Sequence, residues 1–297
     1  MDQGAMYNRQ RMFGRQTSGS VVCVACGYLV GVNDDRCYNC GRRNPGLWGY
    51  AAAVRQLGSD MGFIPFVIGL SVVMYAMTLI ASRGDIFGGG SPLSILSPTG
   101  LSLFLFGASG SVPVMEYHRW WTVLSASWLH GSLIHIFMNL YWVRQIGPPV
   151  AEMYGPGRLI IIYTISGVAG FLLTSLAGYY LEFIPIAVLR GAPLTVGASA
   201  SIFGLFGALV YYGRRAGSGA ASRIGMQYVL IMFVFGLIMP GIDNYAHAGG
   251  FIGGYVAGQL LDPLKPERIT HMVWAVVCLA LSVLSIVASV VLGLPLG

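Results

Sequence analysis

GASASIFGLFGAL, residues 197–209, places a serine between small residues at the start of an apolar run of helical length. Small side chains are common wherever membrane helices pack closely, so Ser199 alone does not indicate chemistry. A second stretch, DNYAHAGGFIGGYVAG at residues 243–258, carries His247 in another apolar run. An ionisable side chain inside a membrane is costly and usually functional, so Ser199 and His247 together are the starting point for interpreting the chain.

The composition is that of a polytopic membrane protein. The chain has 297 residues, of which 55% are hydrophobic and 9% charged, with a mean hydropathy of +0.69. This leaves too little polar surface for a soluble globule. The formal charge of +6 comes from residues that flank apolar runs, and no basic patch indicates nucleic acid as a partner. The first sixty residues lack the apolar core of a signal peptide, so we expect them to be retained.

Four cysteines near the amino terminus have the spacing of a small zinc ribbon. We expect residues 1–20 to be a flexible tail and residues 21–43 to bind one structural zinc through Cys23, Cys26, Cys37 and Cys40. Disulfides or a redox pair are the alternatives. Zinc implies a reducing, cytoplasmic setting, whereas Cys278, inside an apolar run, is expected to be a buried hydrophobic residue. Residues 44–60 are either a linker or an interfacial helix.

The rest of the chain, residues 61–297, predicts an all-α transmembrane domain with seven spans. We expect the spans at residues 61–82, 132–146, 159–177, 197–212, 224–239, 244–261 and 271–294. The segment between the first two spans, residues 84–115, is too long for a simple connector. It contains the apolar residues 101–106, which favours a partly embedded loop.

Lysine and arginine residues predict the orientation. With the amino terminus inside, only Arg83, Arg119 and Arg190 fall on the outer side among the arginines that flank the spans, which satisfies the positive-inside rule. We therefore expect a multi-pass protein of a bacterial cytoplasmic membrane. Its carboxyl terminus then lies outside.

On this orientation Ser199 and His247 lie at matching depth in spans four and six. Span six repeats small residues at Ala246, Gly250, Gly254 and Gly258, and span four offers Gly197, Ser201, Gly204 and Gly207. Such rows let two backbones approach closely, which can bring the Ser199 hydroxyl to the His247 imidazole. The chain places no carboxylate beside them, because Asp243 is expected near the membrane surface. A Ser-His dyad is the simplest interpretation.

A third polar cluster, His130, His135 and Asn139, enters span two from the same side. His135 and Asn139 are four residues apart and share a helix face, so both can donate hydrogen bonds to a developing oxyanion. His130 falls off that face, and we expect it to brace the outer loop. Two alternatives remain: a catalytic zinc held by histidines, although no HExxH motif is present, and polar contacts that only join helices.

These residues resemble the rhomboid family of intramembrane serine proteases over residues 116–258. The HxxxxHxxxN signature matches His130, His135 and Asn139, the GxS motif matches residues 197–199, and the AHxxG motif matches residues 246–250. The resemblance implies a six-helix core, here followed by a seventh helix.

The resemblance also implies the roles of the site residues. Ser199 would be the nucleophile and His247 the general base and then acid. The oxyanion would meet His135, Asn139 and the Ser199 backbone amide. Supporting residues would be Gly197, Phe203 stacked beneath His247, His130 and Arg119.

The sequence departs from the family pattern at two places, and it offers one ion pair in a turn that the family shares. Ala200 stands where the family has glycine, which we expect to lower the rate. His118 and Arg119 replace a Trp-Arg pair in the first outer loop. In the turn at residues 147–155, Glu152 is available to pair with Arg158.

The expected function is a serine endopeptidase that cleaves single-span membrane proteins near the outer face, without a catalytic cofactor. Bulky residues in span five form either a lateral gate or a lipid contact. The lipid bilayer is a further partner, and the ribbon offers a surface for a cytoplasmic one. The alternative is a non-catalytic rhomboid-like factor for membrane-protein binding or trafficking. A transporter is disfavoured because no inverted repeat is evident.

Overall fold

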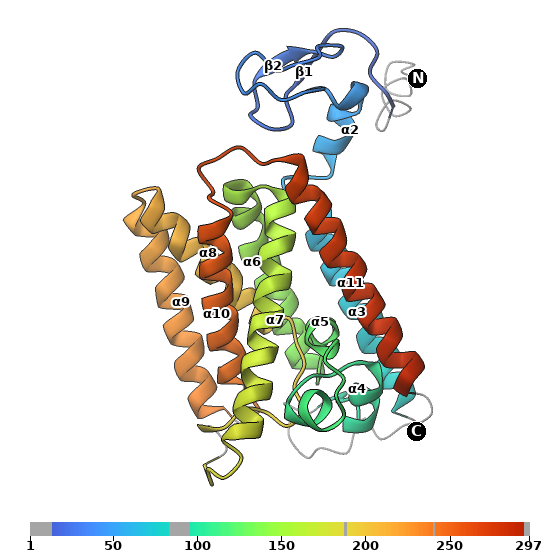
Figure 1. Ribbon diagram of the computed structural model, residues 1–297, viewed down its shortest axis with the longest axis vertical. Coiled ribbons are helices and arrows are strands. Elements are labelled where there is room, and N and C mark those ends of the chain that lie inside the picture. The colour runs from blue at the N-terminus through green and yellow to red at the C-terminus, as the bar shows by residue number, and fades with distance from the viewer. Residues whose placement is uncertain (1–13, 83–94, 187–188, 240, 294–297) are drawn as a thin grey trace, which may run out of the picture.

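The computed structural model describes residues 14–82, 95–186, 189–239 and 241–293. A small amino-terminal lobe, the ribbon, stands over one end of a helical bundle (Figure 1). The lobe contains the strands β1 (Ser20–Val22) and β2 (Leu29–Gly31), the short 3-10 helix η1 (Leu47–Gly49) and the helix α2 (Ala51–Gln56). The long helices are α3 (Phe63–Ala81), α6 (Leu133–Tyr154), α7 (Pro156–Tyr180), α8 (Ser199–Arg215), α9 (Gly219–Ile238), α10 (Asn244–Leu260) and α11 (Ile269–Gly293).

The seven long helices fall where the sequence predicts spans, and the predicted fold class is confirmed. Among the described residues, α3, α7, α9 and α11 are long and apolar enough to cross a membrane by themselves. The chain is therefore an integral membrane protein. The helices α8 and α10 have only 17 residues each, and α6 is less apolar than the four spans because it carries polar side chains and two prolines.

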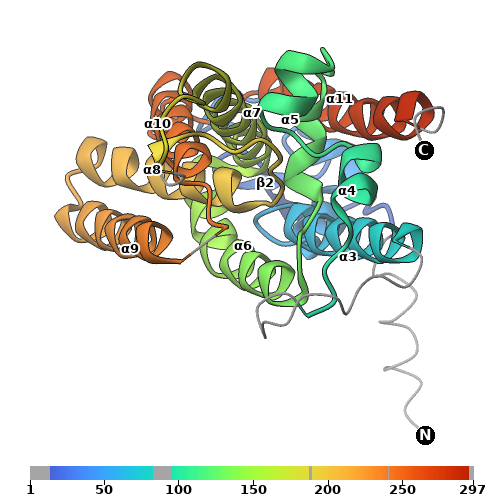
Figure 2. The ribbon, with the colours of Figure 1, turned by 90° about the horizontal axis from the view of Figure 1, so that it is seen from below.

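Glycines bring α8 and α10 into backbone contact, as the two rows of small residues predict. A Cβ atom on Gly250 would lie 2.1 Å from the Ala200 carbonyl oxygen, and one on Gly254 would lie 2.0 Å from that of Gly204. No side chain larger than hydrogen fits at those distances. In the view from below, α8 and α10 lie against α7, while α9 stands at the edge of the bundle (Figure 2). The buried α8 is thus the central element.

Among the described residues between α3 and α6, four short helices lie toward the end of the bundle away from the ribbon (Figure 1). They are α4 (Gly100–Phe106), the π-helical turn η3 (Val112–Glu116), α5 (Thr122–Ser125) and the 3-10 turn η4 (Ala126–Trp128). Thr99 caps α4 by accepting a hydrogen bond from the Ser102 amide. Residues 101–106 are therefore helical. Part of the predicted embedded loop, residues 84–94, lies outside the described residues.

The predicted pairing of Glu152 with Arg158 is wrong. The Arg158 guanidinium donates to the carbonyl oxygens of Leu261, Asp262 and Lys265 at 2.8, 2.8 and 2.9 Å, and Glu267 accepts from the Arg158 amide at 2.9 Å. Glu152 is exposed. Arg158 points toward the end of α10, where free carbonyl groups attract a cation more strongly than a solvated carboxylate does.

Candidate functional site

Ser199 and His247 meet between α8 and α10. The His247 Nε2 atom lies 2.9 Å from the Ser199 Oγ atom, a hydrogen-bond distance. Ser199 is the first residue of α8, and His247 lies in the first turn of α10. Because α10 ends close to the ribbon, this pair lies toward the opposite end of the bundle (Figure 1). A serine and a histidine 48 residues apart are thus joined by the close packing of two helices.

The segment before Ser199 holds its position through the backbone. The Gly197 amide donates to the Ala126 carbonyl at 2.9 Å, and Thr195 pairs with Ser109 in both directions at 2.8 and 3.0 Å. Gly197 has φ +126°, a conformation that L side chains rarely adopt. A Cβ atom there would also lie 2.6 Å from the His135 Nε2 atom. Glycine is required at this position for both reasons.

Two neighbours fix the His247 ring. Phe203 stacks on it with ring centroids 4.0 Å apart and planes 9° from parallel. Asp243 caps α10 by accepting from the Ala246 amide at 3.0 Å, and it does not reach the ring. Among the described residues, the His247 Nδ1 atom has no hydrogen-bond partner. The arrangement therefore has two members, without a carboxylate behind the histidine.

His135 and Asn139 lie on one face of α6, beside this pair. The Gly131 amide donates to the His135 Nδ1 atom at 3.2 Å, so Nε2 carries the ring proton and faces Gly197. The buried Asn139 donates one amide hydrogen to the His135 carbonyl at 2.8 Å and keeps a second hydrogen. Both side chains can thus offer a donor close to Ser199.

His130 precedes α6, so the helical angle from which we predicted its direction does not apply. It is fully buried, and its ring packs edge-to-face against His135 with centroids 5.3 Å apart. Neither ring nitrogen has a partner within the described part of the chain. In that same part, the four amino-terminal cysteines are the only cluster that could hold a metal. The geometry gives no support to a zinc ion held by the histidines.

Ala200 packs in a small apolar cluster with Ala126, Phe171 and Ala246. It is fully buried. A Cβ atom on Gly170 of α7 would lie 2.7 Å from the Ala200 methyl group, so the glycine provides the space that this methyl group fills. The departure from the expected glycine is therefore accommodated by packing.

Some contributors to the site were missed in the sequence. Gly170 gives room to Ala200, and Ser132 caps α6 by accepting from the His135 amide at 3.3 Å. The sequence carries a helix-capping signal at Ser132, three residues before His135, from which this cap could have been predicted. Gly170 carried no local signal, because its role depends on a neighbour in another helix.

Arg119 joins the segment between η3 and α5 to the last helix. Its guanidinium donates to the Phe104 carbonyl at 2.7 Å and to the Ser289 carbonyl at 2.9 Å. Trp121 donates from Nε1 to the Ser289 Oγ atom at 3.0 Å. Arg119 is 4% exposed and lies 4.5 Å from the centroid of the Phe104 ring. The loop that holds the Gly197 amide is thus tied to α11.

We expect Arg119→Leu to lower the free energy of unfolding by about 3 kcal/mol, because two buried carbonyls lose a charged donor. Thermal unfolding in detergent measures the change. The control is Arg190→Leu, since Arg190 is exposed and, among the described residues, donates only to the Glu182 carbonyl at 3.4 Å. Equal effects of the two substitutions would contradict a bracing role for Arg119.

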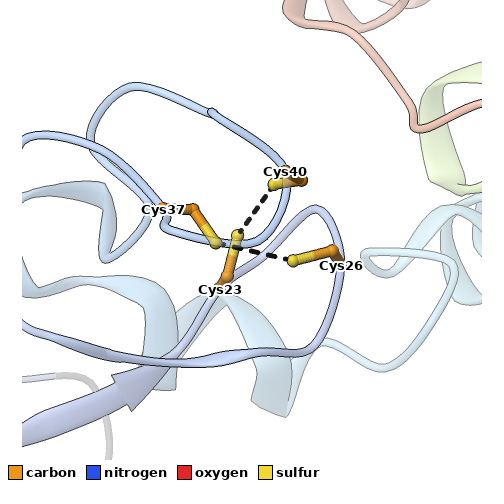
Figure 3. Close-up of side chains that lie close together, drawn as sticks. All are labelled: Cys23, Cys26, Cys37 and Cys40. Atoms are coloured by element: carbon orange, nitrogen blue, oxygen red, sulfur yellow. Dashed lines mark hydrogen bonds between the residues drawn. The ribbon is translucent and has the colours of Figure 1, made fainter.

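The four ribbon cysteines converge on one point (Figure 3). Their sulfur atoms all lie within 4.8 Å of one another, with 3.8 Å between Cys23 and Cys40 and 3.6 Å between Cys26 and Cys37. A tetrahedral zinc with bonds of about 2.3 Å separates its sulfur ligands by roughly 3.8 Å. A disulfide would require about 2 Å, and all five cysteines of the chain are free. The donor set therefore fits zinc.

The surroundings of Cys26 favour its thiolate form. Burial acts to raise the pKa of the Cys26 thiol, but hydrogen bonds from the Tyr28 backbone and the Asn39 side chain lower that pKa to about 6. A thiolate is the form that ligates a metal.

We expect the full chain to bind one structural zinc ion, and the pair of substitutions Cys23→Ser and Cys26→Ser to abolish binding. Metal ligation would contribute most of the ribbon's folding free energy, about 10–16 kcal/mol for zinc-finger peptides. Elemental analysis measures the zinc, and limited proteolysis the order of the ribbon. Cys278→Ser, in α11, is the control that keeps the metal. A wild-type protein without zinc would refute the prediction.

Comparison with known proteins assigns the fold to a class. Residues 117–264 match the family model described as a Rhomboid domain. The "RHOMBOID-like protein 7" of Arabidopsis thaliana is 33% identical over 56% of this chain and 51% of its own length. The "Rhomboid protease GluP" of Bacillus subtilis (strain 168) is 31% identical over 61% of this chain and 34% of its own length. The chain belongs to the rhomboid family through this domain, and the resemblance is confirmed.

The relatives differ in what their names say of activity. The "Inactive RHOMBOID-like protein 8" of Arabidopsis thaliana is 27% identical over 67% of this chain and 58% of its own length. The chain spans less than two thirds of each of these three relatives. The family therefore includes both a protease and a relative named inactive. The geometry of the site is the basis for deciding between these two kinds of function.

Proposed function

We propose that this protein is an intramembrane serine endopeptidase with Ser199 as nucleophile and His247 as general base and acid. The observation that carries the proposal is the 2.9 Å distance between the His247 Nε2 and Ser199 Oγ atoms. A histidine within hydrogen-bond reach of a serine hydroxyl can remove its proton during attack. The stacked Phe203 supports the same assignment, because it holds the ring in the orientation that this transfer requires.

The proposed reaction has two stages. The Ser199 oxygen attacks a peptide carbonyl carbon while its proton passes to His247 Nε2, and the carbonyl oxygen takes the negative charge. The C–N bond then breaks, the proton passes to the leaving amine, and an acyl enzyme remains. Water attacks that ester with His247 as base, which releases the acid product and restores Ser199. Hydrogen-bond donors at the carbonyl oxygen stabilise both tetrahedral states.

His135, Asn139 and the Ser199 amide are the proposed donors to that oxygen. The inferred tautomer puts the His135 proton on Nε2, next to Gly197, and Asn139 retains a free amide hydrogen. Removing one such donor from a protease typically lowers the rate by about 10²–10³-fold. This fits the role of His135 and Asn139 better than simple helix joining does, since neither contributes a side-chain hydrogen bond between helices among the described residues.

The proposed substrates are single-span membrane proteins cut near the outer face. The asymmetry of lysine and arginine supports an inner ribbon, and hence an outer Ser199 and His247. The edge helix α9 is the proposed lateral entry. Its Tyr228 ring packs against Trp142 of α6 at 5.2 Å between centroids, so an aromatic contact joins α9 to α6. An inner cytoplasmic partner for the ribbon is part of the same proposal.

The test is cleavage of a tagged single-span protein by the purified chain in liposomes, with the cut located by mass spectrometry. We expect two products and a cut in the outer third of the substrate helix. The matched negative control is the variant Ser199→Ala. A wild-type chain that binds the substrate without cutting it would favour the alternative, a non-catalytic membrane-protein binding or trafficking factor.

A further inference from the structure

A cleft of about 600 Å³ separates the ribbon from the loop between α10 and α11. Arg42, Arg43 and Trp48 line the ribbon side. Lys265, Glu267 and Arg268 line the loop side. The two walls come from segments more than 200 residues apart in sequence, and they face each other at the ribbon end of the bundle (Figure 1).

The loop wall is fixed by Arg158. Its guanidinium holds the carbonyls of Leu261, Asp262 and Lys265, and its amide holds the Glu267 carboxylate. Glu267, the single acidic side chain that lines the cleft, therefore already accepts a hydrogen bond from the Arg158 amide. Lys265 and Arg268 are therefore presented on a fixed backbone, while their own side chains remain exposed.

The cleft carries an excess of positive charge. Four lining residues are cations, and one is a carboxylate. Within the described part of the chain, Lys265 pairs with Asp262 at 3.3 Å, but Arg42, Arg43 and Arg268 join no ion pair. The Arg42 Nε atom is buried and without a partner there. A zinc tetrathiolate carries two net negative charges and would lie close to Arg42, two residues from Cys40. Since Lys265 is paired with Asp262, the lining cations in that part of the chain without an opposite charge beside them are Arg43 and Arg268.

Apolar groups lie beside these cations. Trp48 is 65% exposed, and Ile269, the first residue of α11, is 63% exposed. Because α11 is long and apolar enough to cross the bilayer, its first residue lies near the membrane surface. Tryptophan side chains favour the headgroup level. Cations next to apolar groups, on both walls of the cleft, match a phosphate ester that is attached to lipid chains.

We propose that this cleft binds the phosphate headgroup of an anionic phospholipid from the leaflet on the ribbon side. Arg43 and Arg268, one from each wall, would hold the phosphate oxygens, and Trp48 and Ile269 would contact the glycerol and the upper acyl chains. Basic clusters at the inner surface attract anionic lipids, and pockets of this kind retain their headgroups. A bound lipid would join the ribbon to the bundle.

The test compares lipid binding by the full chain in neutral detergent, using native mass spectrometry. The titrants are phosphatidylglycerol and phosphatidylcholine with the same acyl chains. The test variant is Arg43→Gln with Arg268→Gln, and the control is Arg214→Gln with Arg223→Gln, exposed arginines of α8 and α9 outside the cleft. Arg268→Gln alone serves as a second variant that leaves the ribbon untouched. Zinc content verifies that the ribbon is intact in each protein.

We expect the wild-type chain and the control to prefer phosphatidylglycerol, and the double variant to bind it about 30-fold more weakly. Arg268→Gln alone should bind phosphatidylglycerol about fivefold more weakly than the wild type. Equal binding of the two lipids by the wild type would overturn the proposal. So would equal losses in the test and control variants. Displacement of phosphatidylglycerol by inorganic phosphate at constant ionic strength would assign the cleft to a soluble anion instead, and would also overturn it.

Discussion

Ser199→Ala and His247→Ala are each expected to lower kcat/KM by about 10⁴-fold or more, and the double variant no further than either alone. The two side chains act as one unit, because the His247 Nε2 atom has to take the proton of the Ser199 hydroxyl 2.9 Å away. Without His247, the Ser199 hydroxyl is not activated, and without Ser199, His247 has no hydroxyl to deprotonate. The measurement is the rate of cleavage of a single-span substrate in liposomes for the four proteins.

Matched controls separate this effect from damage to the fold. Ser201→Ala removes a buried hydroxyl two residues along α8, whose Oγ atom lies 3.5 Å from that of Ser127 and does not meet His247. His271→Ala removes a histidine at the start of α11, far from the pair in the bundle. Both should retain cleavage. Additive losses in the double variant would show that Ser199 and His247 act separately.

Gly254→Ala is expected to lower the free energy of unfolding by about 1–3 kcal/mol and to reduce cleavage, although Gly254 touches neither member of the dyad. The added Cβ atom would lie 2.0 Å from the Gly204 carbonyl oxygen, which is backbone and cannot rotate away. The substitution therefore forces α10 away from α8. Since Ser199 and His247 lie on these two helices, their separation increases as well.

Gly69→Ala is the matched control, because it makes the same change in the middle of α3. An added Cβ atom on Gly69 has no atom within 4 Å. Alanine is the better helix former by roughly 0.5–1 kcal/mol, so Gly69→Ala should leave stability unchanged or raise it. Thermal unfolding and cleavage give both readouts. A Gly254→Ala protein as stable and active as Gly69→Ala would refute close packing of α8 on α10.

The sequence predicts the long helices and the pairing of α8 with α10, because local patterns carry both. Long apolar runs predict spans, and small residues every fourth position mark the face where two backbones meet. The convergence of Cys23, Cys26, Cys37 and Cys40 follows in the same way from two short knuckles. Domain boundaries and the roles of the site residues stay predictions.

Contacts between distant segments were not predictable from local patterns. Arg119 was expected to be a supporting residue, but its partner Ser289 lies 170 residues away in a helix without any distinguishing motif there. Glu152 was assigned to Arg158 because the two are close in sequence, whereas Arg158 binds the end of α10. Burial explains both cases: a buried arginine takes the carbonyl groups that tertiary packing presents to it.

The most direct test of the central claim is covalent labelling of the full chain in lipid by a fluorophosphonate probe, followed by peptide mass spectrometry. Such a probe reacts with a serine hydroxyl that an adjacent base activates. We predict one adduct, on Ser199, which is absent from Ser199→Ala and strongly reduced in His247→Ala. Labelling of Ser199 at the wild-type rate in His247→Ala, or no adduct on Ser199 in the wild type, would contradict the account.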